Sequence, residues 1–280
     1  MATVPDGHEN MPAMERRPLG GSGLTVPVIG MGTWQTFDVR DAAAVRPVTD
    51  AALAAGATFF DSSPMYGHAE RVLAETLGPR RAPVQIATKV WADSPREGRD
   101  QIRQALAWYG GRVDLYQIHN LVAWREHLPY LEELREKGAV GAIGITHYSA
   151  SAFGEMASIL ETGRVTAIQV PLNPREREVE RTLLPLAAAR DVGVVVMRPL
   201  GQGSLARRAP APRELGFLAD YGLRTWAQAL LNWGVSDARV SVSIPATSSA
   251  AHMADNCAVG DARRFDEAAR ERVAALAARR

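Results

Sequence analysis

The sequence feature that most limits the possible folds is a repeated alternation of short apolar runs with longer amphipathic or alanine-rich stretches. From Val28 onward, eight apolar runs of strand length are each followed by a stretch of helical character. No change of composition divides the 280-residue chain. Eight such units over roughly 250 residues are typical of a (β/α)8 barrel, so we predict an α/β fold of the TIM-barrel type.

The expected strands and helices have well-separated bounds. Strands are predicted over 28–34, 57–63, 84–90, 113–120, 140–146, 167–170, 192–197 and 240–244. Helices are predicted over 41–55, 68–77, 96–109, 127–137, 150–161, 178–190, 223–233, 248–259 and 266–279. A doubly wound sheet is the competing fold. It is disfavoured because no second domain is appended and no G-x-G-x-x-G follows a strand and opens a helix.

Three segments lie outside the repeating units. Residues 19–28 surround a glycine turn and predict a short β-hairpin, which we expect to close the bottom of the barrel. Residues 1–15 are polar and lack the apolar core of a signal peptide. We expect a flexible tail over 1–15 and one barrel domain over 16–280. Residues 206–214, rich in Arg and Pro, are expected to form a long loop.

Composition excludes several classes of function. A net charge of +1 argues against a nucleic-acid or membrane-surface partner, and no apolar run approaches the ~20 residues that span a bilayer. Cys257 is the single cysteine, so neither an intramolecular disulfide nor a cysteine metal cluster is possible, which suits a cytoplasmic protein. No His-x-His follows a strand, so no metal site is expected.

One lysine is unusual. Only Lys89 and Lys137 are lysines among 32 basic residues; the others are arginines. Lys137 lies in a charged helix end, whereas Lys89 lies on a largely apolar strand. An ammonium is a compact charge whose pKa responds to its surroundings, unlike a guanidinium, so this position suggests a need for lysine. The alternative is a snorkelling lysine at a strand end.

Three further polar side chains are expected at the same rim of the barrel, because reacting groups in such barrels follow the carboxyl ends of strands. Asp61 ends the second predicted strand, Tyr66 follows five residues later, and His119 ends the fourth strand. Taken singly, Asp61 is explained as a helix cap, and His119 as a hydrogen-bonded structural residue. Side-chain alternation, however, places Lys89 and His119 on the inward faces of their strands, with Gln117 beside them.

These four side chains suggest acid catalysis. A nearby ammonium favours a phenolate, so Lys89 would make the Tyr66 phenol a better proton donor. The Asp61 carboxylate would keep Lys89 charged, and His119 would orient a substrate oxygen or relay a proton. Such a site protonates a carbonyl oxygen, but its residues cannot supply electrons.

The stretch Phe60–Gly67, with Ala87-Thr88-Lys89 and Gln117-Ile118-His119, resembles the aldo-keto reductases over about residues 16–259. The resemblance implies an NAD(P)H-dependent oxidoreductase that reduces an aldehyde or ketone to an alcohol. It implies that Tyr66 donates the proton, that Lys89 and Asp61 adjust the acidity of Tyr66 electrostatically, and that His119 orients the substrate. The partner would be a small carbonyl compound.

The same resemblance implies a set of cofactor-binding residues. These are Thr33, Trp34, Asp61, Thr146, His147, Gln169, Met197, Arg198, Leu200, Gly201, Gly203, Thr247, His252, Asp255 and Asn256. His147 replaces the usual asparagine, Met197 replaces a stacking aromatic, and Ala246 and His252 occupy positions that often carry a basic pair. We expect NADPH, with NADH possible and Arg207 or Arg208 as substitute cations.

The substrate-binding residues are expected to be Trp34, Tyr66, Trp91, His119 and Trp124, with the tryptophans lining an apolar pocket. Two other functions stay open. One is a Schiff-base aldolase that uses Lys89 as its nucleophile. The other is a cofactor-binding regulatory module with little turnover, because a fold alone does not give a function.

Overall fold

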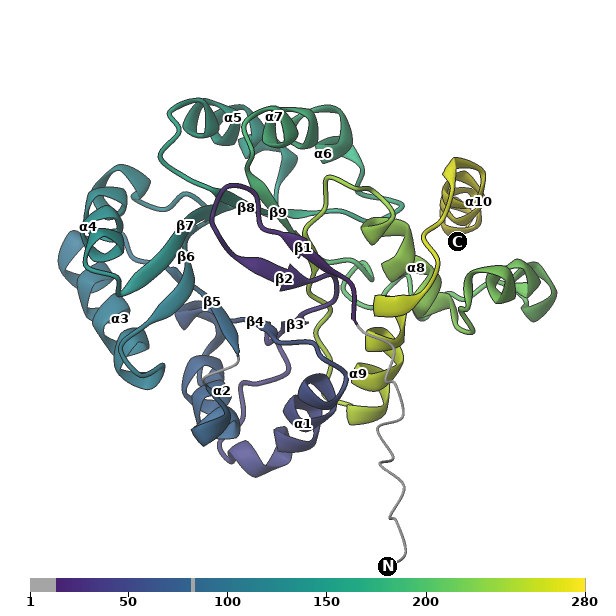
Figure 1. Ribbon diagram of the computed structural model, residues 1–280, viewed down its shortest axis with the longest axis horizontal. Helices are drawn as coiled ribbons and strands as arrows, with labels where there is room; N and C mark the ends of the chain where they lie inside the picture. Colours follow the sequence, from purple (N-terminus) through teal and green to yellow (C-terminus); the bar gives the residue numbers. More distant parts are fainter. Residues whose placement is uncertain (1–13, 82–83, 280) are drawn as a thin grey trace, which may run out of the picture.

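The computed structural model describes residues 14–81 and 84–279. Its centre is an eight-stranded parallel sheet in which strands that are consecutive in the chain pair with each other. The strands are β3 (Met31–Gly32), β4 (Phe59–Asp61), β5 (Gln85–Val90), β6 (Val113–His119), β7 (Val140–Thr146), β8 (Ala167–Pro171), β9 (Gly193–Met197) and β10 (Val242–Ser243). Parallel bridges from Ile29 to Ser243 and from Gly32 to Ala246 join the two ends of the sheet. The predicted (β/α)8 barrel is therefore confirmed (Figure 1).

Helices surround the barrel (Figure 1). They are α1 (Arg46–Ala54), α2 (Ala69–Leu77), α3 (Pro95–Trp108), α4 (Trp124–Glu136), α5 (Phe153–Glu161), α6 (Glu178–Arg181), α7 (Leu183–Ala189), α8 (Trp226–Val235), α9 (Ala250–Cys257) and α10 (Glu267–Ala278). None of the helices in the described ranges combines the length and apolar character needed to cross a bilayer.

Two helical segments differ from the prediction. The single helix expected over 178–190 is divided at Thr182 into α6 and α7. Pro185 explains the break, because it has no N–H to donate to the carbonyl of Arg181. The segment after β9 is also more ordered than expected, since it contains short 3-10 helices at Pro212–Glu214 and Gly216–Tyr221.

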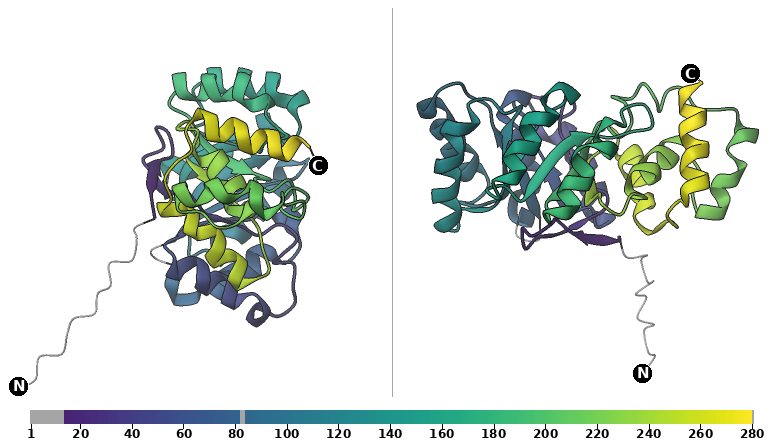
Figure 2. Two further views of the ribbon diagram at one scale, coloured as in Figure 1. Left: turned by 90° about the vertical axis from the view of Figure 1, so that its right-hand side faces the viewer. Right: turned by 90° about the horizontal axis from the view of Figure 1, so that it is seen from above.

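The N-terminal hairpin closes the lower end of the barrel, as predicted. Strands β1 (Arg16–Pro18) and β2 (Thr25–Pro27) pair antiparallel, and the turn between them carries Leu19 into the barrel interior. Gly20 lies against the backbone of Val192 and Gly193 with no room for a side chain. The right-hand view of Figure 2 shows the hairpin across that end.

The tail expected over residues 1–15 falls mostly outside the described residues. Its last residue, Glu15, is held in place: its N–H donates to the carbonyl of Gly260, and its carboxylate pairs with Arg17 and Arg264. Glu15 is therefore attached to the barrel domain.

Side-chain alternation along the strands divides the core. Ile86, Val90 and Tyr116 face the helices, while Ala87 and Leu115 fill the lower barrel interior. One step further along the same inward face, the apolar residues give way to polar ones. The barrel is thus apolar near the hairpin and polar at the carboxyl ends of its strands, where the site lies.

Candidate active site

The centre of the site is a buried ion pair between neighbouring strands β4 and β5. The Lys89 ammonium donates to both carboxylate oxygens of Asp61, at 2.9 and 2.7 Å, and to the carbonyl of Ser62 at 2.7 Å. Both side chains are almost fully buried. Burial alone would lower the pKa of Lys89, but the Asp61 carboxylate and the Tyr66 side chain together raise that pKa above its ordinary value. Lys89 is therefore charged at neutral pH.

Two amides complete the surroundings of the carboxylate. The Nε2 atoms of Gln117 on β6 and Gln169 on β8 donate to Asp61 at 3.2 and 3.4 Å. These four hydrogen bonds to the two oxygens lower the pKa of Asp61, but burial of the carboxyl outweighs them and leaves that pKa above its ordinary value. The alternation that turns Lys89 inward also turns Gln117 inward, as the sequence predicted.

Tyr66 is positioned by a short 3-10 turn that follows β4. The Ser63 hydroxyl accepts the Met65 N–H and so begins this turn. Gly67 ends it at a φ of +64°, where a Cβ would collide with the Asp38 carboxylate, so glycine is favoured there. The Lys89 Nζ atom lies 5.1 Å from the centre of the Tyr66 ring.

The ionisation of Tyr66 differs from the expectation. Burial raises the pKa of Tyr66, and the Lys89 ammonium opposes this effect without overcoming it, so the pKa lies above its ordinary value. The ammonium acts in the direction we predicted, but desolvation of a phenolate costs more. The phenol is consequently protonated at neutral pH and available as a proton donor.

His119 lies at the end of β6 with its ring perpendicular to that of Tyr66, the centroids 5.8 Å apart. Its Nδ1 atom is 2.9 Å from the Ser63 hydroxyl. Burial, together with the Lys89 cation, lowers the pKa of His119 to about 3. The ring is therefore neutral at physiological pH.

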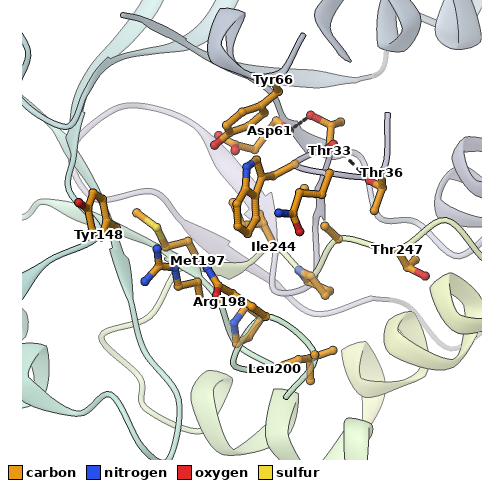
Figure 3. Close-up of a pocket in the computed structure, with 18 of the residues that line it drawn as sticks. Thr33, Thr36, Asp61, Tyr66, Tyr148, Met197, Arg198, Leu200, Ile244 and Thr247 are labelled. Carbon is orange, nitrogen blue, oxygen red and sulfur yellow. Dashed lines mark hydrogen bonds between the residues drawn. The ribbon is translucent and has the colours of Figure 1, made fainter. Parts of the chain in front are cut away.

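A cavity of about 640 Å³ opens beside this group at the carboxyl ends of the strands. Figure 3 shows Asp61 and Tyr66 together at one edge of it, with Tyr148, Met197 and Arg198 grouped at another. Of the residues implied to bind cofactor, Thr33, Trp34, Asp61, Thr146, Gln169, Met197, Arg198, Leu200, Gly203 and Thr247 line the cavity.

The other implied cofactor residues do not line it. They are His147, Gly201, His252, Asp255 and Asn256. The Nδ1 atom of His147 accepts the Ser149 N–H, and its ring stacks on Tyr148. Asp255 accepts hydrogen bonds from Thr225 and Gln228 of the neighbouring helix, which occupies its carboxylate.

The wall of the cavity contains unsatisfied polar atoms. The Thr146 hydroxyl and the Gln169 Oε1 atom are buried and have no hydrogen-bond partner among the described residues. Buried polar atoms are normally paired, so both fit a bound ligand with donor and acceptor groups. A primary carboxamide has both.

The structure places the three predicted pocket tryptophans differently. Trp34 lines the cavity, but Trp91 and Trp124 do not. The backbone of Trp91 is held by the Gln101 amide, and the residue stays 43% exposed. The Trp124 indole donates to Glu155 of α5 at 2.8 Å, which holds it away from the site.

Sequence reasoning missed several residues of the site. Alternation alone places Ser63 on the same face as Asp61, so a signal for it existed. Nothing in the sequence pointed to Tyr148, whose ring lies 5.1 Å from the Arg198 guanidinium. Arg207 was only one of two candidate cations; the cavity wall includes Arg207, and Arg208 is not part of that wall.

Comparison with known proteins finds a matching family model and similar sequences. The sequence model of the Aldo/keto reductase family matches residues 28–278. An uncharacterised oxidoreductase of Mycobacterium bovis is 32% identical over 198 residues, which cover 63% of this chain and 59% of that relative. An aldo-keto reductase of a Mycobacterium species (strain KMS) is 31% identical over 227 residues, covering 75% of this chain and 76% of the relative.

Solved structures share the fold. The holo form of an aldo-keto reductase from Bacillus halodurans superposes with a TM-score of 0.80 at 23% identity, covering 94% of this chain and 96% of that one. An aldo-keto reductase from Klebsiella pneumoniae, solved in complex with NADPH, gives a TM-score of 0.76 at 23% identity, with 92% of each chain covered.

Proposed function

Since the chain belongs to the aldo/keto reductase family, we propose that it reduces an aldehyde or ketone to an alcohol with NADPH. The observation that carries this proposal is the placement of Tyr66, beside the charged Lys89–Asp61 pair and the neutral His119, at the wall of one cavity. These are the groups that protonation of a carbonyl oxygen requires.

The cavity fits the cofactor. The unpaired Thr146 hydroxyl and Gln169 Oε1 would hold the nicotinamide carboxamide, and Met197 would contact the ring. Thr247 and Ser248, just before α9, suit a phosphate because N–H groups at a helix start are free to bind anions. When bound, NADPH supplies the hydride that the carbonyl carbon accepts.

Tyr66 supplies the proton. Its raised pKa keeps the phenol protonated until an oxygen with growing negative charge accepts a hydrogen bond from it. The Lys89 ammonium then stabilises the phenolate that forms, at a buried position where charge interactions are strong. Asp61 holds Lys89 in that position through two hydrogen bonds. His119 and Trp34, which both line the cavity, orient the substrate.

NADPH is favoured over NADH by the NADPH complex of the Klebsiella pneumoniae relative and by one feature of this chain. Ala246 and His252 offer no fixed positive charge, but the exposed Arg207 lines the same cavity as Thr247. Arg207 forms no ion pair with any residue in the described ranges, so its charge is available to a cofactor phosphate.

The Schiff-base aldolase is disfavoured by the state of Lys89. A nucleophilic lysine must be neutral and accessible, whereas Lys89 has no exposed surface and a pKa raised by Asp61. The cofactor-binding module with little turnover is disfavoured because all four groups of the acid site are present and in contact.

A carbonyl panel assayed with NADPH and NADH in parallel tests the proposal. We expect oxidation of the cofactor to match alcohol formation, and Tyr66→Phe to lose this activity while still binding NADPH. Tight NADPH binding with no turnover across aldehydes and ketones would support the regulatory module instead. Trapping of a substrate on Lys89 by borohydride would support the aldolase.

A further inference from the structure

Ser63 links the turn that carries Tyr66 to the ring of His119. Its hydroxyl oxygen is 2.9 Å from His119 Nδ1 and 3.3 Å from the Met65 N–H. Ser63 has no exposed surface, and His119 is only 6% exposed. The position of the hydroxyl proton therefore follows from counting donors and acceptors.

The Met65 N–H can only donate, so it uses one lone pair of the Ser63 oxygen. The remaining question is which of Ser63 and His119 donates in the contact between them. If His119 Nδ1 carried the proton, the Ser63 hydroxyl would accept twice and its own proton would have no acceptor among the described residues. An unmade hydrogen bond of a buried hydroxyl is costly, so the serine donates and Nδ1 accepts.

A neutral imidazole carries one ring proton. With Nδ1 as the acceptor, the proton of His119 is on Nε2. No described residue forms a hydrogen bond with Nε2, and His119 is part of the cavity wall. The Nε2–H is therefore free to donate to a molecule in the cavity.

We propose that Ser63 is a positioning residue that holds His119 in the Nε2–H tautomer, so that His119 donates a hydrogen bond to the carbonyl oxygen of the substrate. The opposite tautomer would present a lone pair to that oxygen and repel it. With Tyr66 as the second donor, the carbonyl oxygen receives two hydrogen bonds from perpendicular rings. The lowered pKa of His119 keeps the ring neutral at physiological pH, which favours the orienting role over a relay through a doubly protonated ring.

This inference rests on the proposed function, but its first test does not need a substrate. Nitrogen-15 spectra of the full-length protein with labelled histidines distinguish protonated from unprotonated ring nitrogens, and His119→Gln identifies the His119 signals among the six histidines. We expect protonated Nε2 and unprotonated Nδ1, unchanged between about pH 5 and 8 because burial keeps the ring neutral. A proton on Nδ1 would overturn the proposal.

Kinetics of Ser63→Ala provide the second test. Loss of the hydroxyl removes the donor to Nδ1, so the tautomer signals should shift or broaden. We expect kcat for carbonyl reduction to fall about three- to tenfold with KM little changed, the range for one neutral hydrogen bond. Ser63→Thr keeps a hydroxyl and should restore the wild-type tautomer and rate.

Ser241→Ala is the matched control, because Ser241 is also a buried hydroxyl but lies at the opposite end of the barrel, bonded to Pro18. It should leave the His119 signals unchanged. Wild-type tautomer and kcat in Ser63→Ala would refute the role of Ser63. If the tautomer is as expected but no carbonyl compound is reduced, the proposed function fails while the structural role of Ser63 stands.

Discussion

The replacement of Lys89 by methionine separates the structural from the catalytic role of the buried ion pair. In Lys89→Met, the Asp61 carboxylate stays buried but loses its two shortest hydrogen bonds, those of 2.7 and 2.9 Å. Only the amides of Gln117 and Gln169 remain, at 3.2 and 3.4 Å. Removing one partner of a buried pair destabilises a fold by about 3–5 kcal/mol, and we expect that loss at neutral pH.

The double variant Asp61→Asn/Lys89→Met is the matched comparison. It removes both charges while keeping an amide in place of the carboxylate, so most of the lost stability should return, to within about 1–2 kcal/mol of wild type. Guanidinium unfolding of wild type, both single variants and the double variant gives the coupling between the two residues. We expect a coupling of about 3 kcal/mol, although every variant should be inactive.

The pH dependence of folding stability provides an independent test. Burial raises the pKa of Asp61 already in wild type, and without the counter-charge in Lys89→Met it raises the folded-state pKa further above the unfolded value of about 3.9. The contribution of Asp61 to stability is then fully present below its unfolded-state pKa and is lost as the pH rises through its folded-state pKa. In wild type, the raised pKa of Lys89 adds stability at every pH below the unfolded lysine value of about 10.4. Equal stability of Lys89→Met and wild type near pH 7 would refute this reasoning.

Three other predictions use different parts of the structure. Tyr66→Phe should lower kcat for carbonyl reduction by at least about 10²-fold with an unchanged NADPH dissociation constant measured by fluorescence, because only proton transfer is removed; retained activity would contradict the role of Tyr66. Arg207→Ala should weaken NADPH binding about two- to fivefold and NADH binding less, because one exposed charge is lost; equal weakening of both would place Arg207 away from the adenosine phosphate that distinguishes NADPH from NADH. Burial raises the pKa of Glu70 to about 7, so its carboxyl stabilises the fold below about pH 4.5 and that contribution disappears as the pH rises through 7. Glu70→Gln should therefore remove about 3 kcal/mol of pH-dependent stability between pH 4 and 8 in guanidinium titrations, and an unaltered pH profile would exclude ionisation of Glu70 in this range.

Much of the fold was predictable because it follows from the pattern of residues within each strand and helix. Alternation along a strand determines which side chains face inward, and this rule by itself places Lys89, Gln117 and His119 on the inner face. Strands that are consecutive in the chain pair in the barrel, so Asp61 and Lys89 could be expected to meet. Where the prediction was wrong, a local rule had been overlooked: Pro185 divides the expected helix over 178–190.

The arrangement around these residues was not predictable, because it depends on residues far apart in the chain. Gln169 reaches Asp61 across 108 positions, and no pattern in the sequence signals that contact. Trp91 and Trp124 follow strands in the expected way, but contacts with Gln101 and Glu155 hold them outside the cavity. Loops after strands are free to take many paths, so their side chains cannot be placed by alternation.

The sequence by itself determined the barrel and the order of its acidic, phenolic, cationic and imidazole groups, since residue type and strand period are properties of the chain. Only the tertiary structure decided how those groups ionise. Burial raises the pKa of Tyr66 despite Lys89, and it keeps His119 neutral. Desolvation depends on everything packed around a group, and the tautomer of His119 depends on one hydroxyl, that of Ser63, 56 residues away in the chain.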